Sequence, residues 1–95
     1  CGPAFAYMFA EALGDGVLSC GVPRKLAYEY AAQMMIGAGK MILETGEHPG
    51  RLKDGVCSPG GATIQGVRAL EKGAFRSAVF EAVVEAYIKT TKLAE

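Results

Sequence analysis

A glycine-rich turn that leads into a helix is the segment of this sequence best suited to chemistry. It runs Ser58-Pro59-Gly60-Gly61-Ala62-Thr63. The first turn of a helix has backbone N–H groups without partners inside the helix, and the helix dipole adds partial positive charge there. Two glycines leave those groups open, and the hydroxyls of Ser58 and Thr63 can donate or accept hydrogen bonds. The segment therefore predicts a binding site for a carboxylate or a phosphate.

The residue types of this turn leave an alternative open. No lysine follows the glycines, as a nucleotide-binding P-loop would require, so a triphosphate is disfavoured. The segment could also be an ordinary turn between helices in which Ser58 acts as a cap. Glycine-rich helix starts are common in proteins, so the pattern alone does not decide between a site and a turn.

The remaining polar residues are weaker candidates for chemistry. His48 lies in an expected loop, where a lone histidine is most often a surface or capping residue. Glu11 lies on an apolar helix, and we expect it to find a partner or to reach solvent. The three cysteines and the single histidine have no metal-ligand spacing, so no metal site is expected. Reduced thiols are typical of a cytoplasmic protein.

Charge and hydropathy exclude several classes of protein. Ten basic residues balance ten acidic residues, so no basic surface indicates nucleic acid as a partner. Hydrophobic residues make up 51% of the 95-residue chain, which favours a folded domain over disorder. No uninterrupted apolar stretch is long enough for a membrane span, and no charged start indicates a signal peptide.

Glycine and proline divide the chain into five predicted helices, and no strand-like alternation is long enough to indicate a sheet. Pro3 and Pro23 suit first helical turns, and Gly46 suits a C-cap. Gly14, Gly16 and Gly21 are expected to loosen the chain after the first helix. The fold class is therefore all-α, a helical bundle, with helices over about residues 3–15, 23–46, 49–56, 62–72 and 75–93.

The second and last of these helices are apolar over most of their circumference, with narrow polar stripes such as Lys25, Glu29, Gln33, Lys40 and Glu44. One small monomer cannot bury so much apolar surface, so we expect an obligate homodimer. The alternative is that these residues form the ordinary core of a compact bundle. Small residues would allow crossing helices to approach closely, namely Ala27, Ala31, Ala32, Gly37, Ala38 and Gly39.

The turn and its surroundings resemble the pyrroline-5-carboxylate reductases. The likeness is carried by residues 48–54, His-Pro-Gly-Arg-Leu-Lys-Asp, and residues 56–64, Val-Cys-Ser-Pro-Gly-Gly-Ala-Thr-Ile. It extends over essentially the whole chain, as in Gly2-Pro3-Ala4 and Gly37-Ala38-Gly39-Lys40-Met41. The resemblance implies that residues 1–95 are the C-terminal dimerisation and substrate-binding domain, cut away from an N-terminal Rossmann domain.

This resemblance also implies an activity. Such enzymes reduce 1-pyrroline-5-carboxylate to L-proline in proline biosynthesis, by hydride transfer from NADPH or NADH. Their C-terminal domains interlock as a homodimer, and several members assemble as a decamer of five dimers. The isolated chain is expected to be inactive, because the cofactor domain is not part of it.

Site residues follow from the resemblance by position. Ser58, Gly60, Gly61, Ala62 and Thr63 would bind the substrate carboxylate, and Thr63 would also be the catalytic residue, with its hydroxyl on the ring nitrogen. Cys1 and Val56 would lie near the cofactor. Cys1 replaces a serine usual in the family, and a thiol is the poorer hydrogen-bonding group.

Two other functions remain open from the sequence. One is a non-catalytic helical oligomerisation module, which would have no reason to keep Ser58, Gly60, Gly61 and Thr63 together. The other is a small carboxylate-binding regulatory protein, which would bind proline as an isolated chain.

Overall fold

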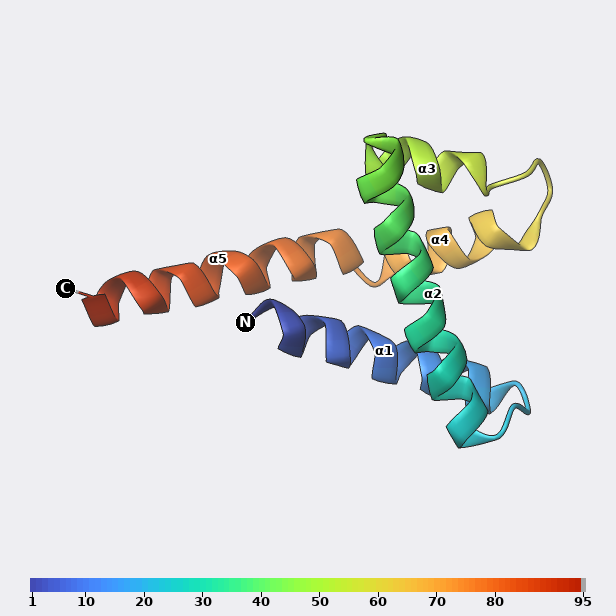
Figure 1. The fold of residues 1–95 in the computed structure, drawn as a ribbon, viewed down its shortest axis with the longest axis horizontal. Helices are drawn as coiled ribbons and strands as arrows, with labels where there is room; N and C mark the ends of the chain where they lie inside the picture. Colours follow the sequence, from blue (N-terminus) through green and yellow to red (C-terminus); the bar gives the residue numbers. More distant parts are fainter. Residues whose placement is uncertain (95) are drawn as a thin grey trace. The chain divides into compact units, whose positions relative to one another are not determined.

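The computed structural model describes residues 1–94, with side chains through Thr91. This part consists of five helices joined by short links and contains no strand (Figure 1). The prediction of an all-α chain with about five helices is confirmed. The helices are α1 (Gly2–Ser19), α2 (Arg24–Thr45), α3 (Pro49–Gly55), α4 (Ala62–Lys72) and α5 (Phe75–Ala94).

Both ends of α2 lie where local residue types predict them. Pro23 precedes the helix with φ −56° and ψ 145°, an extended conformation from which a helix can begin. Gly46 follows it with φ 66°, in the left-handed region, and its N–H donates to the Ile42 carbonyl at 3.1 Å. A glycine after the last turn adopts this conformation at little cost, which is why the helix ends there.

The prediction that the chain loosens at Gly14 and Gly16 is wrong, whereas Gly21 does lie in the link after α1, with φ 108°. The helix continues through Gly14 and Gly16 to Ser19. Gly14 is buried, and a Cβ built on it would overlap the ring of Tyr28. Its absent side chain therefore serves close packing between helices rather than a break in one.

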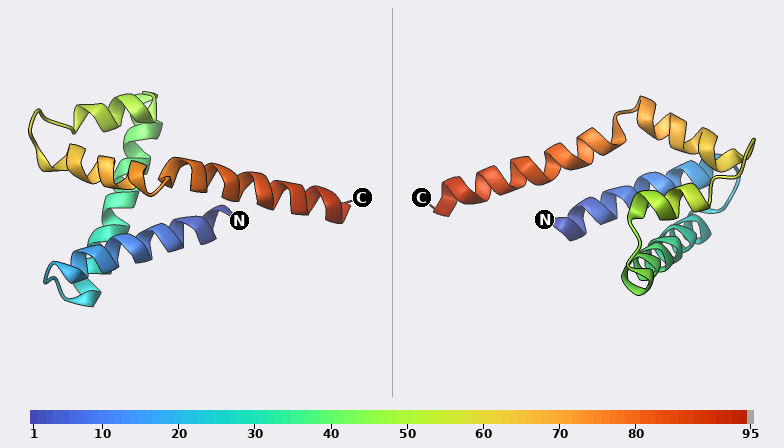
Figure 2. Two further views of the ribbon diagram at one scale, coloured as in Figure 1. Left: turned by 180° about the vertical axis from the view of Figure 1, so that it is seen from behind. Right: turned by 90° about the horizontal axis from the view of Figure 1, so that it is seen from above.

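The chain divides into two compact units, of which the first is Gly2–Leu52. In this unit α2 crosses the C-terminal half of α1 (Figures 1 and 2). Ala27 and Ala31 of α2 are 0% and 2% exposed, and they are the buried hydrophobic residues of the described chain. Small side chains on both helices let the two backbones approach closely, as predicted for Ala27 and Ala31.

The second unit contains residue 53 onward, together with Cys1. Here α4 ends at Lys72, as predicted, and the N–H of Gly73, which follows it, donates to the Ala69 carbonyl at 3.2 Å. The link then turns through Ala74, whose φ of 57° is left-handed. Its N–H donates to the Glu71 carbonyl at 3.0 Å, and α5 starts at the next residue.

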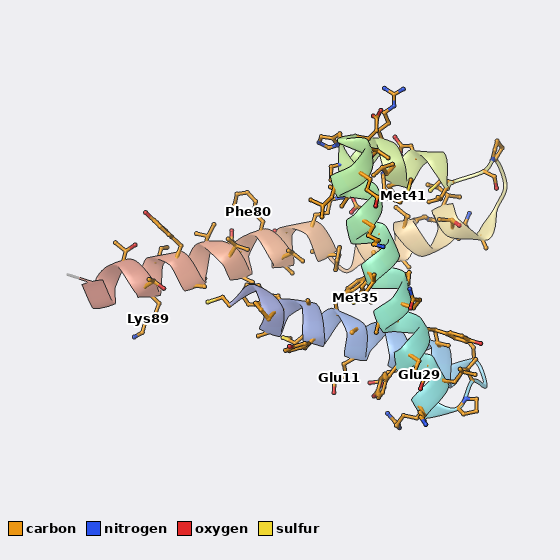
Figure 3. All side chains as sticks on the ribbon, viewed as in Figure 1. Glu11, Glu29, Met35, Met41, Phe80 and Lys89 are labelled. Atoms are coloured by element: carbon orange, nitrogen blue, oxygen red, sulfur yellow. The ribbon has the colours of Figure 1, made fainter. Side chains whose placement is uncertain are left out.

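Most large apolar side chains of both units are exposed. No large side chain in residues 1–91 is fully buried, and Phe80 on α5 is 69% exposed (Figure 3). The alternative prediction, that these residues form an ordinary core within one chain, is therefore wrong. Other exposed apolar residues include Tyr7, Met8, Tyr30, Met34, Ile36, Met41, Leu43, Val83 and Tyr87.

Length and apolar composition decide whether a helix can cross a membrane. None of the five, over the residues described, combines the length and the apolar composition that a bilayer span needs.

Candidate functional site

The segment Ser58–Gly61 forms a tight turn immediately before α4. The Gly61 N–H donates to the Ser58 carbonyl at 3.0 Å, which closes the turn. Gly60 has φ 72°, a conformation that a side chain would strain. Proline at the second position and a left-handed glycine at the third are the signature of a type II turn. Proline and glycine here are thus explained by backbone conformation alone.

Helix α4 begins with open donors. Gly61 precedes it with φ −80° and ψ 171°, and no side chain caps this end. Ala62 and Thr63 occupy the first two helical positions, and both are exposed. Their N–H groups have no partner inside the helix, and the helix dipole adds partial positive charge at the same place. An anion could therefore approach this end of α4 from solvent.

Ser58 lies against Gly61 and does not cap the helix. Its hydroxyl makes no hydrogen bond to any part of the chain that the structure describes, so the alternative of a capping serine is wrong. A Cβ on Gly61 would lie 2.5 Å from Ser58 Oγ, so that hydroxyl sits directly over the Gly61 Cα. The turn therefore brings one free hydroxyl beside the start of α4, where Thr63 adds a second.

Gly61 itself differs from the donors that follow it. Its N–H is already used by the Ser58 carbonyl within the turn. The groups left to meet an anion are the N–H groups of Ala62 and Thr63 and the hydroxyls of Ser58 and Thr63. Gly60 and Gly61 shape the surface around these groups.

His48 is a capping residue, as its loop position indicated. Its Nδ1 accepts a hydrogen bond from the Gly50 N–H at 2.9 Å, which satisfies one donor of the first turn of α3. Beside it, Arg51 pairs with Glu47 at 3.4 Å on the exposed surface. This end of α3 is explained by helix capping and needs no role in catalysis.

The two residues expected near a cofactor are both exposed. Cys1 precedes α1, and Val56 lies two positions before Ser58 with 67% of its surface accessible. Their nearness to a cofactor stays a prediction. All three cysteines carry free thiols.

The structure adds a hollow that the sequence did not indicate. It has a volume of about 370 Å³ and lies along α1 and the start of α2. Glu11, labelled in Figure 3, lines this hollow and is exposed, in agreement with the expectation that it reaches solvent. Its other lining residues are Tyr7, Met8, Ala10 and Tyr28.

A polar cluster joins the helices beside this hollow. Tyr28 Oη donates to Asp15 Oδ1 at 2.8 Å, and Arg24 Nη1 donates to Tyr28 Oη at 2.8 Å. Arg24 also pairs with Asp15 at 3.2 Å. The hydrogen bond to Asp15 raises the pKa of Tyr28, and the hydrogen bond with Tyr28 raises the pKa of Arg24. From the sequence, only the contact between Arg24 and Tyr28 could have been predicted, because the two residues lie one turn apart on a helix.

A metal ion or a dinucleotide would each need a particular set of residues. Within the described chain, no three His, Cys, Asp or Glu side chains gather as a possible metal site. Residues 1–94 also contain no strand, so they do not form the strand–turn–helix that cradles a dinucleotide. The described helices therefore do not by themselves fit NADPH or NADH.

Fold and turn together define a class: an all-helical domain that exposes its large apolar side chains and presents a glycine-rich helix start. The family model described as "Pyrroline-5-carboxylate reductase dimerisation" matches residues 1–93 of the chain. The chain belongs to this family of dimerisation domains.

Curated relatives agree with this assignment. The chain is 54% identical over 93 residues to a pyrroline-5-carboxylate reductase of Escherichia coli, covering 98% of this chain and 35% of the relative. It is 50% identical over 92 residues to pyrroline-5-carboxylate reductase 2 of Homo sapiens, covering 97% of this chain and 29% of the relative. The chain thus spans about a third of the length of the relatives it matches.

Solved structures share the fold. A pyrroline carboxylate reductase of Plasmodium falciparum, solved with NADP bound, has a TM-score of 0.83 and 37% identity over 87% of this chain and 32% of that one. A pyrroline-5-carboxylate reductase of Coxiella burnetii has a TM-score of 0.84 and 34% identity over 90% of this chain and 32% of that one.

Proposed function

We propose that this chain is the dimer-forming, substrate-binding part of a pyrroline-5-carboxylate reductase. The observation that carries the proposal is the start of α4, where two open N–H groups and two hydroxyls meet beside a glycine turn. This arrangement suits a carboxylate, and the substrate named by the relatives is a carboxylate.

In the proposed reaction, the residues of this chain bind and orient the substrate. Ser58 and the N–H groups of Ala62 and Thr63 hold the carboxylate of 1-pyrroline-5-carboxylate, against a surface shaped by Gly60 and Gly61. The Thr63 hydroxyl accepts a hydrogen bond from the protonated ring nitrogen and so orients the iminium form, whose C=N carbon takes up the hydride. NADPH or NADH supplies the hydride that gives L-proline, and residues outside this sequence would hold it, since the described helices do not fit a dinucleotide. Positioning of this kind is what a protein contributes to a cofactor reaction.

The proposed partner of this chain is a second copy of itself. Its large apolar side chains are exposed, and only Ala27 and Ala31 form a buried apolar core in the described chain. Obligate homodimers bury apolar surfaces of this kind, and the family is described by dimerisation. We infer an interlocked homodimer, with a decamer of five dimers as its further assembly. Three free thiols support a cytoplasmic location.

Complementation of a proline-requiring bacterium tests this proposal. The strain lacks its own reductase and receives the full-length protein that contains residues 1–95. A parallel chimera carries residues 1–93 in place of the matching 93 residues of the Escherichia coli relative. We expect both proteins to restore growth without proline. The matched control is the Ser58→Ala, Thr63→Val double variant of each, which we expect to grow poorly without proline.

The chimera also separates this proposal from a non-catalytic oligomerisation module. A chimera that forms dimers yet reduces no pyrroline-5-carboxylate would favour such a module. Proline binding by the isolated chain, measured by calorimetry, would favour a regulatory carboxylate-binding protein instead.

A further inference from the structure

The side chain of Ser58 occupies the space that any side chain at position 61 would need. A Cβ built on Gly61 would lie 2.5 Å from Ser58 Oγ and 3.2 Å from the Ser58 carbonyl oxygen. Real Cβ atoms essentially never approach another heavy atom within 3.0 Å. The Ser58 hydroxyl could therefore not stay in place if residue 61 carried a side chain.

Backbone conformation does not explain this glycine. Gly61 has φ −80° and ψ 171°, which every L-residue adopts without strain. Its neighbour Gly60 has φ 72°, where a side chain is disfavoured wherever its atoms point. The two adjacent glycines are thus required for different reasons. Gly60 is required by the backbone conformation of the turn, and Gly61 is required because the Ser58 side chain fills the space beside it.

The Gly61 N–H does not explain the glycine either. That group donates to the Ser58 carbonyl at 3.0 Å, and any residue other than proline could make the same bond. What glycine chiefly provides at position 61 is room for the Ser58 hydroxyl, the nearest of the atoms that a Cβ would meet.

We propose that Gly61 is a positioning residue, which holds the Ser58 hydroxyl beside the open N–H groups of Ala62 and Thr63. The inference rests on the proposed function, because it takes the ligand of those groups to be the substrate carboxylate. Gly61 contributes to carboxylate binding through Ser58 and donates no hydrogen bond to the ligand. Its contribution therefore disappears when the Ser58 hydroxyl is removed.

A double-mutant cycle in the full-length protein tests this dependence. The variants are Ser58→Ala, Gly61→Ala and the double variant, and the readout is the KM for pyrroline-5-carboxylate against kcat. Loss of a hydrogen bond to a charged group is expected to raise KM about tenfold in Ser58→Ala. Gly61→Ala is expected to raise KM by a similar factor, because its methyl group displaces the hydroxyl. The double variant is expected to match Ser58→Ala closely. With the hydroxyl gone, the added Cβ lies 3.7 Å from Ser58 Cβ, an ordinary contact, and 3.2 Å from the Ser58 carbonyl oxygen, a tight contact that a shift of a few tenths of an ångström relieves.

Gly66→Ala is the matched control on the same helix, because a Cβ there meets no atom within 4 Å. It is expected to leave KM unchanged. Circular dichroism at 222 nm verifies that each variant keeps its helices. If Gly61→Ala alone fails to fold, the comparison of Ser58→Ala with the double variant still tests the proposal.

Two results would overturn the role of Gly61 while leaving the proposed function intact. One is a wild-type KM in Gly61→Ala when Ser58→Ala is impaired. The other is a KM for the double variant that exceeds the Ser58→Ala value by another tenfold or so, since the two losses would then be independent. A wild-type KM in Ser58→Ala has a different meaning, because it would remove Ser58 from the proposed carboxylate site itself.

Discussion

Gly14 of α1 is in direct contact with the ring of Tyr28 of α2. A Cβ at position 14 would overlap the ring carbon Cδ1 and would lie 2.6 Å from Cε1. The same ring carries the hydroxyl that donates to Asp15, one residue beyond the glycine. One tyrosine therefore packs against the α1 backbone and is hydrogen-bonded to the next side chain. This contact sets how closely the first two helices approach.

Gly14→Ala is expected to destabilise the protein by about 1–3 kcal/mol, because the added methyl overlaps the Tyr28 ring and displaces it from its packed position. The measurement is the free energy of unfolding from urea titration of the full-length protein. Gly16→Ala is the control, since a Cβ there meets nothing within 4 Å. It is expected to stabilise α1 by roughly 0.5–1 kcal/mol through helix propensity. Equal effects of the two substitutions would contradict the packing role of Gly14.

Stability is expected to fall at alkaline pH as Tyr28 ionises. The hydrogen bond to Asp15 raises the pKa of Tyr28 above its ordinary value of 10.0. A proton held more tightly in the folded state contributes stability below pH 10, and this contribution is lost as the pH rises through the folded pKa. Tyr28→Phe should remove this part of the pH dependence.

The measurement is the midpoint of thermal unfolding between pH 8 and pH 11, for the wild type and for Tyr28→Phe. Tyr30→Phe serves as the matched control, because Tyr30 is an exposed tyrosine on the same helix. A Tyr28→Phe profile that parallels the wild type across this range would refute the role of the hydrogen bond to Asp15.

Thr63→Val is expected to lower kcat/KM of the full-length protein by about tenfold to a hundredfold. The substitution removes the hydroxyl proposed to bind the ring nitrogen, and hydrogen bonds to charged groups are worth about 1.5–3 kcal/mol. Thr63→Ser keeps the hydroxyl and should retain most of the activity. The measurement is kcat/KM from steady-state kinetics with pyrroline-5-carboxylate. Equal kcat/KM for Thr63→Val and Thr63→Ser would contradict the proposed role of the Thr63 hydroxyl.

Phe80→Glu is expected to shift the protein from dimer toward monomer. Phe80 is a large apolar side chain with 69% of its surface exposed on α5, and a buried charge in an apolar interface is costly. Ser77→Glu introduces the same charge one turn earlier, at a polar position in line with Glu81, Glu85 and Lys89 of α5, and should leave the dimer intact. Molar mass by light scattering, measured over a dilution series, distinguishes the variants. A wild-type protein that is a folded monomer would contradict the proposed homodimer.

The local features of this fold could be predicted from the sequence. Pro23 and Gly46 bound α2 because proline and glycine restrict or release backbone angles within one or two residues. Residues 58–63 were identified as a turn leading into a helix for the same reason, and their pattern pointed to the family that residues 1–93 match. Such signals act over a few residues, so they are present in the chain before it folds.

Only the tertiary structure shows which residues far apart in the sequence contact each other. Gly14 looked like a helix breaker, but it lies inside α1 because the ring of Tyr28 needs the space of a side chain there. Asp15 and Arg24 showed no pairing pattern, and they meet only because α2 crosses α1. These contacts depend on the crossing of two helices, which cannot be read from residue types alone. Ser58 and Gly61 are close in sequence, yet only the folded turn shows that the Ser58 hydroxyl occupies the space where a side chain of residue 61 would lie.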